Sequence, residues 1–298
     1  MKEQPSSGTE RKTIFIGLSG VEMGDEPFHL PRGMVLEKTF AHLMNPMLMS
    51  FGPPTEAGHH PAPWKAVQDG KGADITSQLI VPPSAVSDDQ EYERIAATLM
   101  LLIRVWCDPS AMMIASSLHS FDALPQVPDH EVQIRPIETL QKYFPLAITS
   151  QVSMEERLKW VKLHFEQCHR LMSAKPEFQL AASALNAGQF IPNSALTLIS
   201  LMGALEAIFS PSKTELKFRV SSLIAAYLHP YGKDRLETQK AIGLLYDKRS
   251  AAAHGKPNHA EDDVLKAFEL LRAVLIRMVE DGKVPSKAEL ELSLFGDS

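Results

Sequence analysis

The sequence pattern changes near Ser153, and this change constrains the fold more than any other feature of the chain. Before it, short apolar runs are separated by Pro and Gly, which is typical of strands in a mixed α/β domain. After it, apolar residues recur at the spacing of amphipathic helices, as Leu158 and Val161 do. The sequence therefore predicts an α+β protein, in which a small N-terminal mixed α/β domain precedes an all-α helical bundle.

The length of 298 residues allows two domains at the usual domain size. We expect four parts: a disordered tail over 1–12, the α/β domain over 13–145, the helical bundle over 150–285 and a tail over 286–298. In this last tail Leu290, Leu292 and Leu294 alternate with polar residues. That alternation indicates a strand.

In the N-terminal domain, runs rich in β-branched and other apolar residues predict strands over 14–18, 34–37, 75–81, 112–118 and 132–137. The segment 51–73 is rich in Pro and Gly, which interrupt regular structure, and so predicts an irregular loop. Ser87 and the acids that follow it predict the start of a helix that continues to about Trp106.

The first helix of the bundle is expected at the capping box that Ser153 and Glu156 form. Five more helices follow from the 3.6-residue apolar period and from Pro or Gly at their ends. They are expected at 176–186, 194–209, 214–228, 234–253 and 261–281. Six amphipathic helices with short loops are typical of a bundle.

Composition places the protein in the cytoplasm. No apolar run reaches the ~18–20 residues that span a bilayer, and the N-terminus lacks the apolar core of a secretory signal. The two cysteines, Cys107 and Cys168, are too few for a disulfide framework and favour a reducing compartment.

The net charge of −6 is unevenly distributed. Segment 213–256 holds nine Lys and Arg against four Asp and Glu, which gives it a charge of +5. A local basic field on an acidic protein favours a polyanionic partner at one site. Charge alone fits a solvated pair of helical faces as well.

The segment 246–255, with sequence YDKRSAAAHG, carries the candidate chemistry. Arg249 and His254 lie five positions apart, which on a helix is a turn of about 140° and a rise of about 7.5 Å. Ser250 and Asp247 share a face with His254. Within one chain, therefore, the Arg249 and His254 side chains do not point to the same place. Two copies related by a two-fold axis could bring the Arg249 and His254 of each copy together in one basic cleft.

Such a cleft suits cleavage of RNA without a metal. A histidine can take the 2′-OH proton or protonate the leaving 5′-oxygen, and an arginine can hold a phosphate whose charge grows in the transition state. A histidine before Gly at a helix end is also a common capping residue. The spacing alone leaves both interpretations open.

The order of motifs resembles the HEPN superfamily, and most closely its ApeA-like abortive-infection branch. The first motif is an Ala-Leu-Glu helix that ends in Phe and contains Glu206. The second is a Glu-Leu-x-x-Arg motif that ends at Arg219. The third is the Arg-x4-His motif, which falls on Arg249 and His254. The resemblance covers about 195–280. It implies an α-helical, usually dimeric domain and, in many members, a metal-independent endoribonuclease that leaves a 2′,3′-cyclic phosphate.

We therefore expect a ribonuclease that acts in antiviral defence or as a toxin, with His254 as acid and base and Arg249 as phosphate clamp. Four residues are expected to support this pair: Ser250, Asp247, Glu206 and Tyr246. Three cations are expected to contact RNA: Lys248, Lys256 and Arg219. We expect a homodimer formed through the bundle, and no membrane contact, metal or cofactor.

Two alternatives remain. One is a non-catalytic HEPN dimer that binds nucleotide, RNA or a partner protein. The other is a purely structural role, in which Arg249 pairs with an acid such as Asp247 or Glu237. In either case the N-terminal domain could receive a protein or ligand trigger.

Overall fold

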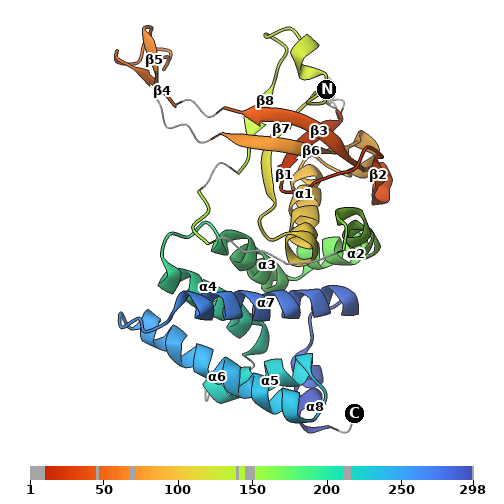
Figure 1. The fold of residues 1–298 in the computed structure, drawn as a ribbon, viewed down its shortest axis with the longest axis vertical. Coiled ribbons are helices and arrows are strands. Elements are labelled where there is room, and N and C mark those ends of the chain that lie inside the picture. Colours follow the sequence, from red (N-terminus) through yellow and green to blue (C-terminus); the bar gives the residue numbers. More distant parts are fainter. Residues whose placement is uncertain are drawn as a thin grey trace, which may run out of the picture. The chain divides into compact units, whose positions relative to one another are not determined.

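The computed structural model describes residues 11–44, 47–67, 72–138, 141–144, 152–210 and 216–296. The chain divides into two compact units (Figure 1). The sheet unit consists of Met1–Ala85 and Met112–Thr139, and the helical unit consists of Val86–Ala111 and Leu140–Ser298. Most of the predicted tail over 1–12, and the motif residue Glu215, lie outside the described residues.

The sheet unit contains an antiparallel six-stranded sheet with the order β2-β3-β6-β1-β7-β8. Its strands are β1 (Ile14–Ser19), β2 (Phe28–His29), β3 (Val35–Leu43), β6 (Ala73–Val81), β7 (Met112–Ser117) and β8 (Ile134–Pro136). Strand β1 lies between β6 and β7, where Ile16 is paired with Leu79 on one side and Ser116 on the other. The N-terminal strand of the unit is thus its central one.

The sheet core requires a glycine in β1. Ile75, Ile114 and Phe121 form a buried cluster. A Cβ atom on Gly17 would lie 2.7 Å from Ile75 Cδ1 and 2.9 Å from Phe121 Cζ. No side chain fits there without displacing this cluster, because protein cores have little free volume.

All five predicted strands of the N-terminal region are confirmed. The segment 51–73, predicted as an irregular loop, is only partly irregular. β4 (Met47–Ser50) and β5 (Trp64–Val67) pair as an antiparallel hairpin, in which Ser50 is opposite Trp64. The Pro and Gly residues between 52 and 63 occupy the connection between the two strands, and residues 68–71 of this segment lie outside the described residues.

The helical unit contains eight α-helices in the described part of the chain. They are α1 (Glu91–Leu102), α2 (Met154–Ala174), α3 (Pro176–Gly188), α4 (Ser194–Phe209), α5 (Leu216–Leu228), α6 (Lys233–Ala253), α7 (Glu261–Asp281) and α8 (Lys287–Phe295). Helix α1 continues as the π-helix η3 (Ile103–Cys107). The six helices predicted after Ser153 are confirmed. The Ser153 side chain accepts a hydrogen bond from the Glu156 N–H, as its capping box predicts.

Helix α1 belongs to the helical unit, whereas the sequence analysis placed it in the domain over 13–145. A buried polar network joins α1 to α2. His169 Nε2 lies 2.7 Å from Glu91 Oε1, and its Nδ1 lies 3.3 Å from Thr98 Oγ1. Because these partners are more than 70 positions apart in the sequence, local patterns could not reveal that α1 packs with helices that follow it much later.

The C-terminal strand prediction was wrong, since residues 287–295 form helix α8. Ser286 and Glu289 form a capping box that starts the helix. Leu290 is buried, whereas Leu292 is 66% exposed. The alternating leucines thus point to different sides of a helix. No helix in the described part of the chain has both the length and the apolar character needed to cross a membrane.

Candidate functional site

The end of α6 fixes the backbone on both sides of His254. Gly255 has a φ of +73°, its N–H donates to the Ala252 carbonyl at 3.1 Å, and the Lys256 N–H donates to the Ala251 carbonyl at 2.9 Å. These two hydrogen bonds around a left-handed glycine define a Schellman C-cap. The predicted helix end at His254 and Gly255 is confirmed, and the His254 side chain is exposed there.

Arg249 is held by helix α4. Its Nη2 donates to Glu206 Oε2 at 3.0 Å, and the two side chains are only 24% and 18% exposed. Arg249 Nε and Glu206 Oε1 are buried and have no hydrogen-bond partner. The pair therefore links α6 to α4 but leaves a donor and an acceptor unsatisfied.

Tyr246 completes this cluster, because its ring centroid lies 5.8 Å from Arg249 Cζ. Burial raises the pKa of the Tyr246 hydroxyl, and the negative charge of Glu206 raises it further, while Arg249 acts in the opposite direction. A hydrogen bond from the Tyr246 hydroxyl to Glu206 acts in the same direction as the burial, so Tyr246 is tied to the Arg249–Glu206 pair.

The other two supporting residues differ in what they contact. Asp247 Oδ2 accepts a hydrogen bond from Lys217 Nζ of α5 at 2.6 Å, and about half of each side chain is exposed. The Ser250 carbonyl accepts the His254 N–H at 3.1 Å. Of the predicted supporting residues, the structure brings Glu206 and Tyr246 to Arg249, while Asp247 is engaged with α5.

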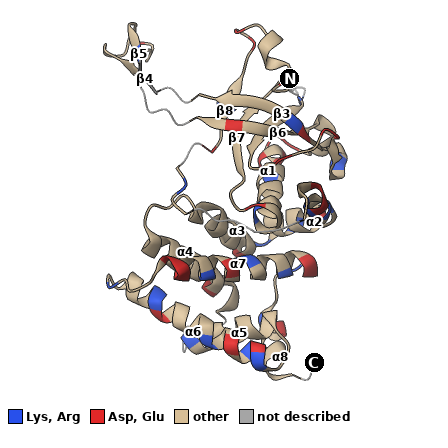
Figure 2. Ribbon diagram, viewed as in Figure 1, with Lys and Arg blue, Asp and Glu red and all other residues tan. Residues whose placement is uncertain are grey.

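The predicted RNA-binding cations also fall into two groups. Lys248 Nζ lies 2.6 Å from Asp263 Oδ2 at the start of α7, and this hydrogen bond holds the pKa of Asp263 below its usual 3.8. Lys256, in the turn after α6, and Arg219, on α5, are exposed. Figure 2 shows positive and negative residues interspersed along α6. The +5 of segment 213–256 already counts its own acids, and Asp263 and Glu206, which lie outside the segment, offset part of it through their contacts with Lys248 and Arg249.

Sequence reasoning missed Asp263 as the partner of Lys248. The acidic residues Glu261, Asp262 and Asp263 indicate the start of α7, because negative charges stabilise a helix N-terminus. Its contact with α6, however, depends on how the two helices pack. Asp263 also accepts the Ala260 N–H at 2.8 Å and so caps α7.

Apolar side chains lie exposed on the two helices next to the motif. Phe218 of α5 is 64% exposed, and Leu236 and Leu244 of α6 are 53% and 64% exposed. Helices α5 and α6 pack against each other, and large apolar residues left exposed on packed helices are candidates for an interaction surface. These three residues are referred to below as the α5–α6 apolar face.

Comparisons of the chain with protein-family models, with curated proteins and with solved structures gave no match. Among the described residues, no group of three or more His, Cys, Asp or Glu lies where it could hold a metal ion.

Proposed function

We propose that this chain is a HEPN-type, metal-independent endoribonuclease that cleaves RNA through attack by the 2′-OH and acts as an antiviral or toxin effector in the cytoplasm. One observation supports it most. At the end of α6, an exposed His254 follows an arginine that Glu206 holds in place and whose side chain is 24% exposed.

His254 supplies the proton transfer. An exposed imidazole can accept the 2′-OH proton and return a proton to the leaving 5′-oxygen near neutral pH. The Schellman cap fixes the backbone of His254, so the ring sits at a defined helix end while its side chain reaches solvent. Proton transfer of this kind contributes about 10²- to 10⁴-fold to a rate.

Arg249 supplies the phosphate contact. A guanidinium has five N–H donors in a planar fork, and here one Nη donates to Glu206. The remaining donors can bind the phosphate as its charge grows in the transition state. Glu206 acts as a positioning residue in this scheme, and Tyr246, whose hydroxyl hydrogen bonds to Glu206, helps to hold it.

A second copy of the chain completes the site. Five positions separate Arg249 from His254, so within one helix the two side chains diverge by about 140°. A two-fold dimer would bring together both pairs. The α5–α6 apolar face supports this arrangement because it gives a second copy a surface to bury beside the motif.

The test uses the full chain, single-stranded RNA and an excess of EDTA. We expect cleavage to continue in EDTA and to leave 2′,3′-cyclic phosphate ends, and we expect His254→Ala to lower the rate by about 10²-fold or more while the dimer persists in size-exclusion chromatography. His29→Ala is the matched control, since this exposed histidine lies in the sheet unit. Cleavage that requires a metal, or full activity of His254→Ala, would contradict the mechanism.

The Arg249–Glu206 pair also favours a second candidate function. A guanidinium already engaged by a carboxylate suits a module that binds nucleotide, RNA or a protein partner without cleaving. RNA binding that depends on Arg249, with no cleavage products, would support this candidate. In both cases we propose that the sheet unit receives the protein or ligand trigger.

A further inference from the structure

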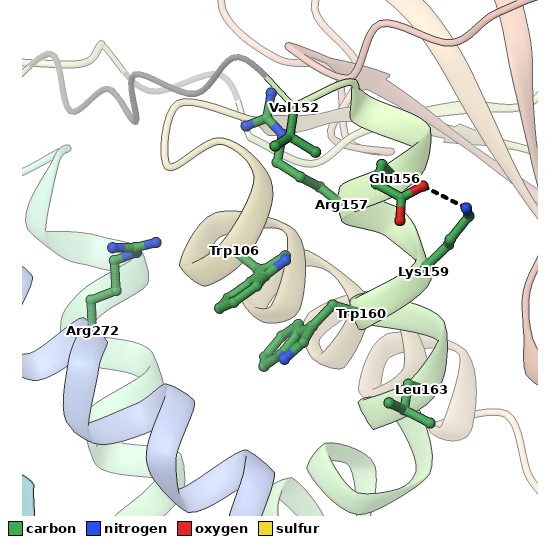
Figure 3. Close-up of a pocket in the computed structure, with 8 residues that line it drawn as sticks. All are labelled: Trp106, Val152, Glu156, Arg157, Lys159, Trp160, Leu163 and Arg272. Carbon is green, nitrogen blue, oxygen red and sulfur yellow. Dashed lines mark hydrogen bonds and ion pairs between the residues drawn. The ribbon is translucent and has the colours of Figure 1, made fainter.

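A cavity of about 500 Å³ opens within the helical unit, where η3, α2 and α7 meet (Figure 3). Its walls include Trp106 of η3, Arg272 of α7 and three residues of α2, namely Arg157, Trp160 and Leu163. Cavities of about 300–1,000 Å³ are the usual size of small-molecule sites. The volume suits a ligand of about the size of one nucleotide.

Two stacked indoles form the apolar wall of this cavity. The ring centroids of Trp106 and Trp160 lie 4.4 Å apart, with an angle of 13° between the planes. The His164 ring lies 4.4 Å from Trp160, and Trp160 Nε1 donates to Glu280 at 3.3 Å. These contacts fix a flat, partly exposed aromatic surface, and such a surface selects planar rings.

Two arginines lie beside the indoles. Arg272 Nε donates to the Val105 carbonyl at 2.5 Å and its Nη1 to Glu269 at 3.0 Å. Arg157 Nη1 donates to the Cys107 carbonyl. Both guanidinium groups are therefore anchored at the C-terminal end of η3.

Arg157 differs from the other cations of the cavity. Lys159 is paired with Glu156 and Arg272 with Glu269, whereas no carboxylate in the described part of the chain pairs with Arg157. Its Nε is buried without an acceptor. A guanidinium without a carboxylate partner attracts anions, so an anion bound in the cavity would supply the opposite charge that Arg157 lacks.

We propose that this cavity binds a free nucleoside phosphate, with the base against the indoles and the phosphate on Arg157 and Arg272. The indole rings can stack with a planar base. A guanidinium group forms stronger, two-point hydrogen bonds with a phosphate than with a neutral ligand. This inference does not rest on the proposed ribonuclease activity, because neither Arg249 nor His254 lines the cavity.

The test exploits the small number of tryptophans. The chain has three, so the full-length Trp64→Phe protein keeps only Trp106 and Trp160 as fluorophores. We expect adenosine 5′-monophosphate to quench their emission saturably, since a stacked base alters the indole environment. Adenosine, which lacks the phosphate, should bind at least about ten-fold more weakly because the charge-assisted contacts are lost.

Two matched variants test the location. Leu163→Glu adds a negative charge at the rim, where this side chain is 74% exposed, and should weaken adenosine 5′-monophosphate binding by about ten-fold through like-charge repulsion. Leu180→Glu makes the same change at a 53% exposed position of α3, outside the cavity, and should leave binding unchanged. Equal thermal unfolding temperatures for the two variants would separate binding from folding.

Three results would overturn the proposal. One is the absence of saturable quenching at millimolar nucleotide. Another is equal affinity of Leu163→Glu and Leu180→Glu. The third is saturation by a single-stranded RNA oligomer where the mononucleotide fails, because the cavity would then be a strand-binding subsite.

Discussion

Two polar pairs hold distant helices together in the helical unit, and they differ in how completely they are satisfied. In the pair between α1 and α2, Glu91 and His169 are 10% and 7% exposed. Both ring nitrogens of His169 have partners, and Glu91 Oε2 also pairs with Arg94 at 2.6 Å. In the pair between α4 and α6, Glu206 and Arg249 are 18% and 24% exposed, and each has an unpartnered polar atom.

This difference separates a structural role from a functional one. The buried Glu91–His169 pair, in which both ring nitrogens have partners, has no hydrogen-bonding capacity left for a ligand. It therefore contributes to the fold. A partly exposed pair contributes less to stability because water competes for its atoms. The Arg249 side chain is 24% exposed and the His169 side chain is 7% exposed, so a ligand could reach Arg249 but not His169.

The largest effect should come from opening the buried Glu91–His169 pair. His169→Ala leaves a cavity and removes the ring that contacts both Glu91 Oε1 and Thr98 Oγ1, so we expect the free energy of unfolding to fall by about 3 kcal/mol. Urea denaturation measures this change. The control is His130→Ala, at a residue whose side chain is 81% exposed, which should change stability by less than about 0.5 kcal/mol. A similar small change in both variants would remove the distinction between the two pairs.

The partly exposed Arg249–Glu206 pair should respond less in stability and more in activity. Glu206→Gln should lower the free energy of unfolding by only about 1 kcal/mol, because the pair is partly solvated. If the chain cleaves RNA, the rate should fall by about ten-fold or more because Arg249 is no longer fixed. A double-mutant cycle with Arg249→Met measures their coupling. A coupling as large as the cost of His169→Ala would show that this pair, too, is structural.

The smallest effect concerns pH and the Lys248–Asp263 contact. The Lys248 hydrogen bond, with help from the Ala260 N–H, lowers the pKa of Asp263 below 3.8. A carboxyl with a lowered folded-state pKa stabilises the fold above its unfolded value, and this stabilisation is lost as pH falls through the folded value. Asp263→Asn should thus be less stable by under about 1 kcal/mol at pH 6.

That difference should shrink when urea midpoints are measured below pH 3.8. Lys248→Gln serves as the companion variant, since it removes the main cause of the shift and should reduce the same acid dependence. A constant difference between the wild-type protein and Asp263→Asn across this range would contradict the assignment.

Local signals allowed most elements of the fold to be predicted. Ser153, Pro176 and Gly255 mark helix ends through their own backbone and side-chain chemistry, and the structure has ends at these positions. The order of the strands was not predictable, because β3 pairs with β6 and β1 with β7 across long stretches of chain. The alternating leucines predicted a strand, whereas the capping box of Ser286 and Glu289 starts helix α8.

The sequence suggests residues for the candidate site but not the contacts between them. The motif order pointed to Arg249 and Glu206, yet their contact spans 43 positions and depends on how α4 packs against α6. Glu237 and Asp247, proposed from the sequence as structural partners of Arg249, pair instead with Lys233 and Lys217. The stack of Trp106 on Trp160 left no signal in the sequence, since aromatic residues at separate positions carry no information about their pairing.

Helix α1 and η3 interrupt the sheet unit in the chain, since β7 and β8 follow them. Neither unit is therefore a continuous piece that can be excised, and a fragment ending near residue 145 would expose the face that His169 covers. During synthesis on the ribosome, α1 is completed at Leu102 before α2 begins at Met154. Until α2 is made and packs, the apolar residues of α1 lack this cover, and exposed apolar surface of this kind favours aggregation or binding by chaperones.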